Sequence, residues 1–375
     1  MDTTSAQNWV TTSAPVANWI SVACSADGIK LVAVDTTGPI YTSADSGVTW
    51  IATSAPLNNW TSVASSADGT RLIAGCYGNP IYTSVDSGAT WIASDSPGGF
   101  LSVASSSDGT KLFGAARYIY TLTPTDGWLF TDSPFYLRWT SVACSADGRH
   151  LIAASRTDGF GGPNGNIDVL GSVWTSADSA ATWQFQNVPL GDWFCVSSSA
   201  DGSRLVGMGG GLAYTSEDSG TNWAKAKVPV RTWTALASSA DGTKLVAVAS
   251  DLKQIFTSSD AGVTWTNSGA PRADWTSVAS SEDGSKVVAV AGGDSAVGRI
   301  YTWRAALPAL SITLSGNTAL ISWPASSTGF ELQENPDLSS KNWTDLTSTP
   351  AVTNQQNQII VSTLNSARFY RLNHP

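Results

Sequence analysis

The sequence predicts an all-β protein: a seven-bladed β-propeller followed by a small β-sandwich. Three observations predict this fold. A phrase of about 40 residues recurs seven times, and this period lies in the range of propeller blades. Each copy consists of short apolar or alternating runs separated by turn residues, without the periodicity of an amphipathic helix. After residue 306 the repeat stops, while strand-like alternation continues to the end.

Each copy of the repeat opens with an aromatic residue. Successive openings are 39 to 42 residues apart, except for one step of 54 residues that carries an insertion. The seven openings are Trp19, Trp60, Phe100, Trp139, Trp193, Trp233 and Trp275.

Four short strands are predicted in each copy. The first is "WTSVASS" at 60–66, and an Asp-Gly pair follows it in all seven copies, which is a strong hairpin signal. The second is a continuous apolar run such as "KLVAV" at 30–34, typical of a strand that is buried on both faces. The third reads "IYTS" at 40–43, and the fourth begins at a Thr-Trp pair.

The link between the third and fourth strands has its own pattern, Ser-x-Asp-x-Gly-x-Thr-Trp. It reads "SADSGVTW" at 43–50, "SVDSGATW" at 84–91 and "SSDAGVTW" at 258–265. The pattern resembles the Asp-box, or BNR repeat, of the sialidase-like propeller superfamily, in which the box is a folding device. Copies at 176–183 and 216–223 depart from it at Ala180 and Asn222, and the seventh blade lacks it. The resemblance implies structural roles for Asp45, Asp86, Asp178, Asp218 and Asp260.

The ends of the repeat predict how the ring closes. The seventh copy stops near Trp303 without a fourth strand, while "SAQNWVTTSAP" at 5–15 matches "GVTWIATSAP" at 47–56. We therefore expect the segment around Trp9 to form the outer strand of blade seven, which ties the two ends of the ring together.

The second domain is expected at 307–375, after a propeller at 1–306. Its strand candidates are "LSITLSGNTALISWP" at 310–324, "TGFELQEN" at 328–335 and "ARFYRL" at 367–372. This alternation resembles a fibronectin type III-like β-sandwich of the kind that secreted bacterial proteins carry, with Trp323 and Tyr370 in the core. The resemblance leaves an adhesive, a spacer and a sorting role open.

Composition narrows the class of partner. Charged residues make up 13% of the chain and the net charge is −9, which argues against a nucleic acid or an anionic membrane surface. Apolar runs are strand-sized, so no membrane insertion is expected. "MDTTSAQNWV" has no signal-peptide pattern, yet the Ser/Thr/Gly/Trp-rich, Lys-poor composition favours a secreted, cell-surface or periplasmic protein over a cytoplasmic one. We expect a monomer.

The four cysteines are interpreted as small buried residues. Cys24 and Cys144 occupy repeat positions at which other copies carry serine. A disulfide or a metal site is the alternative. Because His150 and His374 are the chain's only histidines, no cluster has metal-ligand spacing. We therefore predict no metal and no cofactor.

Strand direction divides the propeller into two faces. The turn face carries the Asp-Gly turns and the aspartate motifs, which are nearly identical among copies. The loop face carries the links from second to third strand and from blade to blade, which differ in every copy. The insertion at 155–172 lies on the loop face. Propellers bind ligands through such loops, so a site is expected there.

Glycoside-cleaving enzyme activity is the main alternative to this binding role. Sialidases of the resembling superfamily use an arginine triad with a Tyr–Glu pair, but Glu217 and Glu282 fall on the turn face, which argues against that chemistry. Relatives that cleave xyloglucan use two aspartates, and a glycoside hydrolase remains an alternative. A multivalent lectin is disfavoured because the loops differ. The available loop-face aspartates are Asp158, Asp168, Asp192, Asp274 and Asp294.

The predicted function is a non-catalytic binding scaffold whose partner is a protein or an extracellular glycan. A second resemblance, to the photosystem II assembly factor type of propeller, also implies protein binding. The long insertion breaks the symmetry of the ring, which predicts one off-centre site near blades three to five. Aromatic and guanidinium groups suit either partner, although tryptophans repeated in phase are more often used for packing between blades. The alternative for the insertion is a mobile loop that binds no ligand. The candidates are Arg117, Arg138, Trp139, Arg156, Phe160 and Trp193.

Overall fold

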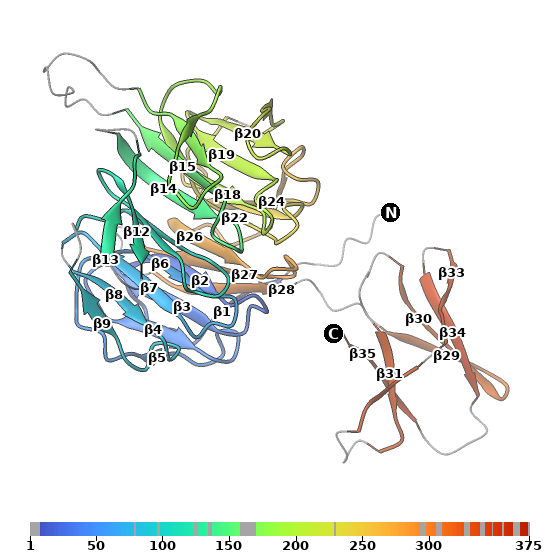
Figure 1. Ribbon diagram of the computed structural model, residues 1–375. Coiled ribbons are helices and arrows are strands. Elements are labelled where there is room, and N and C mark those ends of the chain that lie inside the picture. The colour runs from blue at the N-terminus through green and yellow to red at the C-terminus, as the bar shows by residue number, and fades with distance from the viewer. Residues whose placement is uncertain are drawn as a thin grey trace, which may run out of the picture. The chain divides into compact units, whose positions relative to one another are not determined.

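The computed structural model divides the chain into two compact units, Met1–Ala305 and Ala306–Pro375. Each unit consists of β-sheets (Figure 1). The structure describes the whole chain except residues 1–7, 79, 96–97, 124–126, 134–136, 158–169, 229, 293–297, 305–309, 326–330, 338–341, 347, 355, 363–367 and 374–375. The described part contains no helix long and apolar enough to cross a membrane.

The first unit is a ring of seven four-stranded antiparallel sheets, as the repeat predicts. Blades one to three are β2 (Trp19–Cys24), β3 (Leu31–Asp35), β4 (Ile40–Ser43), β5 (Ile51–Ala52); β6 (Trp60–Ser65), β7 (Leu72–Cys76), β8 (Ile81–Ser84), β9 (Ile92–Ser94); β10 (Ser102–Ser105), β11 (Leu112–Ala115), β12 (Ile119–Thr123), β13 (Gly127–Phe130).

Blades four to six follow the same order. They are β14 (Arg138–Cys144), β15 (Leu151–Arg156), β16 (Val173–Ser176), β17 (Gln184–Phe185); β18 (Trp193–Ser198), β19 (Leu205–Gly209), β20 (Leu212–Ser216), β21 (Ala224–Lys225); β22 (Trp233–Ser238), β23 (Leu245–Ala249), β24 (Gln254–Ser258), β25 (Thr266–Asn267).

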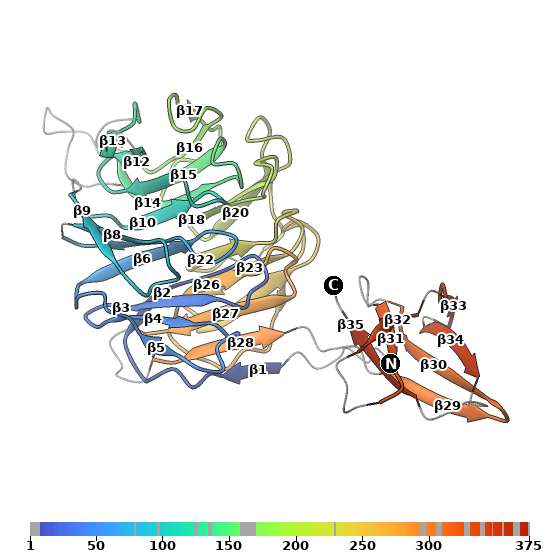
Figure 2. The ribbon, with the colours of Figure 1, turned by 60° about the horizontal axis from the view of Figure 1, so that its bottom comes forward.

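Blade seven confirms the predicted closure. Its sheet has the order β1-β28-β27-β26, so the N-terminal strand β1 (Asn8–Thr11) is the outer strand beside β28 (Ile300–Arg304) (Figure 2). The inner pair is β27 (Lys286–Ala291) and β26 (Trp275–Ser280). Trp9 pairs with Trp303 across β1 and β28, and its ring centroid lies 5.9 Å from that of Trp275. The first and last parts of the unit are thereby joined in one sheet.

A closed circle of backbone hydrogen bonds joins the seven blades on the turn face. In each Asp-Gly turn one amide donates to a carbonyl in the next blade's turn, and Glu282 N donates to Ala26 O at 2.8 Å to complete the circle. The other six bonds are each 2.7 Å. In each of them the amide of one residue donates to the carbonyl of the next residue in the order Ala26, Ala67, Ser107, Ala146, Ala200, Ala240, Glu282.

Side chains of the inner strands add a second set of links between blades. Ser21, Ser62, Ser102, Ser141 and Ser277 each accept a hydrogen bond from an amide of the following blade, at 3.1 to 3.3 Å. A β-bulge follows the opening tryptophan in six blades. At this bulge the Thr140 hydroxyl donates to Trp193 O at 2.7 Å, and Thr276 donates to Trp19 O at 2.9 Å. Inner-strand hydroxyls therefore hold neighbouring blades together.

The second unit contains two antiparallel sheets. One has the order β29-β30-β34-β33 and the other β32-β31-β35. Ile321, Trp323, Leu332 and Ile359 form its buried core, and Tyr370 packs against them, as expected for the two aromatic residues named from the sequence. The strands are β29 (Ser311–Ser315), β30 (Thr318–Pro324), β31 (Glu331–Asn335), β32 (Thr344–Asp345), β33 (Ala351–Thr353), β34 (Gln356–Ser362) and β35 (Phe369–Asn373).

Candidate functional site

The aromatic residues that open the blades pack inside the ring. Trp139 is 0% exposed and Trp193 is 3% exposed. Each opening aromatic in the other blades is equally enclosed, and most meet an aromatic residue of the third strand edge-on, as Trp19 meets Tyr41 at 5.3 Å. Trp139 and Trp193 were candidates for ligand contact; their burial excludes a stacking role. They pack because each indole fills the space between two sheets.

Two arginines of blade four lie directly opposite each other on the loop face. Arg138 begins β14 and Arg156 ends β15, and their Cα atoms are paired in the register of this sheet. Paired residues in an antiparallel ladder project from the same face, and like charges in this position repel each other. Within the described part of the chain, neither side chain has a carboxylate within salt-bridge distance.

Arg117 belongs to the neighbouring blade three. It lies in the tight turn between β11 and β12, where Ala116 N donates to Tyr118 O at 2.9 Å. Ala115 and Ile119, which flank the turn, belong to the same buried cluster as Leu137 and Trp139, which flank Arg138. Arg117 and Arg138, both exposed, therefore lie above one shared cluster. Arg117 and the pair Arg138 and Arg156 thus lie on loop-face segments of two adjacent blades that share this buried cluster.

The insertion of blade four begins and ends at fixed points. Thr157 N donates to Asp192 Oδ1 at 2.8 Å, and Gly191 N donates to Gly171 O at 2.9 Å. Both ends of the insertion are thereby held by the link that leads into blade five. Phe160, the candidate apolar anchor, lies outside the described residues, as do Asp158 and Asp168.

Other loop-face carboxylates have structural partners. Asp274 forms a salt bridge of 2.8 Å with Lys253, and Asp192 accepts the bond from Thr157. Asp294 lies outside the described residues. Glu217 lies in the turn after β20, and Glu282 takes part in the hydrogen-bonded circle, so both are on the turn face. Among the described residues, no group of three or more His, Cys, Asp or Glu side chains could hold a metal ion.

The five aspartate motifs form closed turns on the turn face. In the first, Ser43 Oγ donates to Asp45 Oδ1 at 2.8 Å, while Thr49 donates from its amide to Oδ1 at 2.8 Å and from its hydroxyl to Oδ2 at 2.6 Å. The same bonds recur around Asp86, Asp178 and Asp260. Around Asp218, Asn222 Nδ2 takes the place of the threonine hydroxyl as donor to Oδ2. Because these donors favour the ionised carboxylate, they lower the pKa of Asp86 to about 2.

The aspartate turns also pack against the preceding blade. Gly88 has φ +88°, and a Cβ there would lie 2.9 Å from Thr42 Cγ2 of blade one, so both conformation and space favour glycine. Ala180 takes the equivalent place in blade four with φ 71°. The carboxylates are saturated by their own turns, which makes these motifs structural.

All four cysteines are free thiols. Cys24 Sγ donates to Ser280 O at 3.2 Å, and Cys144 Sγ to Ser105 O at 3.3 Å, in the blade that precedes each. Enclosure of the sulfur raises the pKa of Cys24, Cys144 and Cys195 to about 12. These thiols are not nucleophiles at neutral pH.

Comparison with known proteins supports the fold. No family model matches the sequence, and no curated protein matches it. Among solved structures, hydrazine synthase of Kuenenia stuttgartiensis is similar at 14% identity with a TM-score of 0.59, covering 78% of this chain and 96% of that one. The β-propeller domain of Cps50 (Swd1) from Myceliophteria thermophila is similar at 12% identity with a TM-score of 0.61, covering 79% of this chain and 99% of that one. YCF48 bound to D1 peptide is similar at 14% identity with a TM-score of 0.57, covering 81% of this chain and 98% of that one. At such identities the likeness shows the β-propeller fold alone.

Proposed function

We propose that this protein is a non-catalytic binding scaffold that takes a protein partner on its loop face, at the junction of blades three and four. The observation that carries the proposal is the cross-strand pair Arg138 and Arg156, with Arg117 above the same buried cluster. Repulsion between paired guanidinium groups destabilises the fold. A carboxylate brought by a partner would relieve this repulsion and bind bidentately.

The comparisons agree with a binding role without specifying it. YCF48, one of the propellers of similar fold, is described as bound to a peptide. The five aspartate motifs are engaged by donors of their own turns on the turn face, and Asp192 and Asp274 are engaged on the loop face. A sugar that carries an acid group is the second candidate ligand, because guanidinium groups bind it by the same chemistry.

An array of acidic and neutral peptides, run beside an array of acidic and neutral glycans, tests the proposal. We expect acidic peptides to be retained by the parent protein and lost from the variant Arg138→Glu/Arg156→Glu. Arg149→Glu is the matched control, because Arg149 lies on the turn face, where its Nε donates to Ala177 O. Equal retention by the double variant would refute the site.

Replacing residues 158–169 by a short glycine linker tests the role of the insertion separately. Loss of peptide binding would include the insertion in the site, and unchanged binding would restrict the site to the three arginines. Retention of acidic glycans alone would move the assignment to a lectin. Release of reducing ends from a polysaccharide would move it to a glycoside hydrolase.

A further inference from the structure

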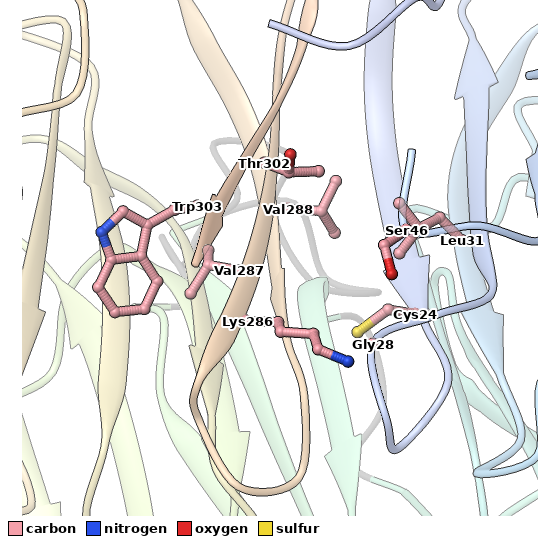
Figure 3. Close-up of a pocket in the computed structure, with 9 residues that line it drawn as sticks. All are labelled: Cys24, Gly28, Leu31, Ser46, Lys286, Val287, Val288, Thr302 and Trp303. Atoms are coloured by element: carbon pink, nitrogen blue, oxygen red, sulfur yellow. The ribbon is translucent and has the colours of Figure 1, made fainter. Parts of the chain in front are cut away.

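Three cavities on the turn face are copies of one crevice between neighbouring blades. Lys286, Gly28 and Ser46 line the one between blades seven and one (Figure 3). Residues at the same repeat positions line the other two: Lys30, Gly69 and Ser87 between blades one and two, and His150, Gly202 and Ser219 between blades four and five. The crevices therefore share a backbone frame and differ in their side chains.

Their sizes differ widely. The crevice between blades seven and one has about 10 Å³ and that between blades four and five about 70 Å³, whereas that between blades one and two has about 220 Å³. A cavity of about 150 Å³ accommodates a benzene molecule. Of the three, only the crevice between blades one and two can take a ligand of that size or larger.

Lys30 is bonded differently from the other lysines at its repeat position. Lys286, Lys111 and Lys244 each donate from Nζ to an Asp carbonyl of the next blade, that is, to Asp27, Asp147 and Asp283, and Lys111 donates in addition to Ser179 Oγ. In the described structure Lys30 Nζ instead donates to Ser87 Oγ at 3.3 Å, and no carboxylate lies within salt-bridge distance of it. Figure 3 shows the contrasting case, in which the Lys286 side chain points toward Gly28 and Cys24. Lys30 thus keeps donors for a ligand at the wall of the widest crevice.

The remainder of that crevice is largely aliphatic. Leu31, Val32 and Leu72 are buried in its wall, and Ile51, which is 70% exposed, lies at its edge. In the crevice between blades four and five, Gln184 replaces Ile51. The turn that supplies Ser87 carries Val85, whereas the turn that supplies Ser219 carries Glu217. Of the crevices between blades one and two and between blades four and five, only the first therefore combines aliphatic side chains with a lysine.

We infer that the crevice between blades one and two binds a small aliphatic carboxylate, with the carboxylate on Lys30 and Ser87 and the hydrocarbon on Leu31, Leu72 and Ile51. Charge-assisted hydrogen bonds supply the polar part of the affinity, and aliphatic burial supplies the rest. Asp45, Asp68 and Asp86 in the surrounding turns are ionised, so a singly charged ligand is preferred over phosphate. The site is on the face opposite the arginines and does not depend on the function proposed for them.

Calorimetric titration of the full chain with 4-methylpentanoate tests the inference. We expect saturable binding that is at least about tenfold weaker for 4-methylpentanamide, which has the same shape without the charge. Lys30→Gln, which keeps the stem against Gly69, should weaken carboxylate binding at least about tenfold, and Ile51→Gln should weaken it severalfold. Lys244→Gln is the matched control and should bind as the parent does. The site would be overturned if the parent bound 4-methylpentanoate and 4-methylpentanamide equally well, or if Lys30→Gln bound 4-methylpentanoate as well as the parent does. Absence of saturable binding would overturn it as well.

N-acetyl-leucine distinguishes the two sources of such a ligand. It carries the same aliphatic group and carboxylate as the C-terminal leucine of a peptide would. Tighter binding of N-acetyl-leucine than of 4-methylpentanoate would assign the crevice to a peptide C-terminus, and the reverse order would assign it to a free organic acid. Because Arg138 and Arg156 are intact in the Lys30 variant, its peptide-array result separates failure here from failure of the loop-face site.

Discussion

The turn face and the loop face of the propeller are built from the same seven repeats, yet their polar groups are used in opposite ways. On the turn face the carboxylates of Asp45 and Asp86 are saturated by hydroxyls and amides of their own turns. On the loop face, Arg138 and Arg156 are paired with each other. Saturated groups stabilise the fold, and unsaturated ones are available to a ligand. The difference indicates that the repeated aspartate turns stabilise the fold, whereas the Arg138–Arg156 pair is left without a carboxylate partner among the described residues.

The largest effect on both faces is expected from opening the ring. Deleting residues 1–14 removes β1, exposes the edge of β28 and takes Trp9 from its contact with Trp275. Loss of a packed tryptophan alone costs about 3–5 kcal/mol, which we expect to lower the Tm of the first unit by roughly 10 °C. Differential scanning calorimetry measures it.

The control for this deletion removes residues 1–7 only, which leaves β1 intact. Its Tm should match that of the parent. An unchanged Tm after deletion of residues 1–14 would contradict the closure by β1 as a source of stability. Both faces depend on the closed ring, so the deletion should weaken ligand binding on either face as well.

Acid should affect the turn face more than the loop face. The pKa of Asp68, Asp86, Asp108 and Asp201 is lowered to about 2, first of all by hydroxyl donors in their turns. Because the pKa of these carboxyls is lower in the folded chain than in the unfolded chain, the unfolded chain binds more protons at any pH between the two pKa values. The stabilisation is therefore complete above the unfolded pKa of about 3.9 and is lost as the pH falls toward 2.

Asp86→Ala makes this expectation measurable. The variant should have a Tm a few degrees below that of the parent at pH 7, because the hydroxyl and amide of Thr90 lose their acceptor. The difference should shrink as the pH is lowered to about 2, where half of the parent's Asp86 carboxylates are protonated. Acidic-peptide retention on the loop face should persist at pH 7. A pH-independent Tm difference would show that Asp86 acts without its charge.

Links between blades give a smaller and more local effect. Thr140 Oγ1 donates to Trp193 O, whereas Thr234 Oγ1, at the same repeat position, is buried without a partner in the described structure. Thr140→Val should lower the free energy of unfolding by about 1 kcal/mol. Thr234→Val should leave it unchanged or raise it, since an unsatisfied polar group is removed. Equal effects in urea titrations would mean that these bonds do not hold the blades together.

Several features of the fold could be predicted from the sequence because they repeat. A hydrogen bond or a packed aromatic residue that recurs in all seven blades leaves similar letters in every copy, and the missing strand of blade seven left a phase mismatch around Trp9 and Trp303. The burial of Trp139 could not be predicted with the same certainty. An indole at the end of a strand can face either a neighbouring sheet or solvent, and Trp139 is enclosed by contacts such as that with Trp183, which its own strand does not reveal.

The candidate site was less predictable because its residues occur once. Arg138 and Arg156 were named individually, but their direct pairing follows from the strand register, which could have been obtained by extending the pairing of Trp139 with Ser155 by one residue. The crevice beside Lys30 was not predicted. Identical residue types at this repeat position, Lys30 and Lys286, have different hydrogen-bond partners, and the sequence does not reveal which partner each lysine takes.

The smallest expected effect is a change in the free energy of unfolding whose sign differs between the two faces. Arg138→Ala removes one of two like charges paired across β14 and β15, and should raise the free energy of unfolding by a few tenths of a kcal/mol. Arg149→Ala on the turn face removes the donor to Ala177 O, and should lower it by a similar amount. Repulsion between exposed charges is screened at about 1 M salt, where the Debye length is about 3 Å. The gain from Arg138→Ala should therefore disappear there, while the loss from Arg149→Ala should largely persist. Urea titrations at low and high salt measure both. If Arg138→Ala lowers stability at both salt concentrations, the arginine pair stabilises the fold and the contrast drawn with the aspartate turns is wrong.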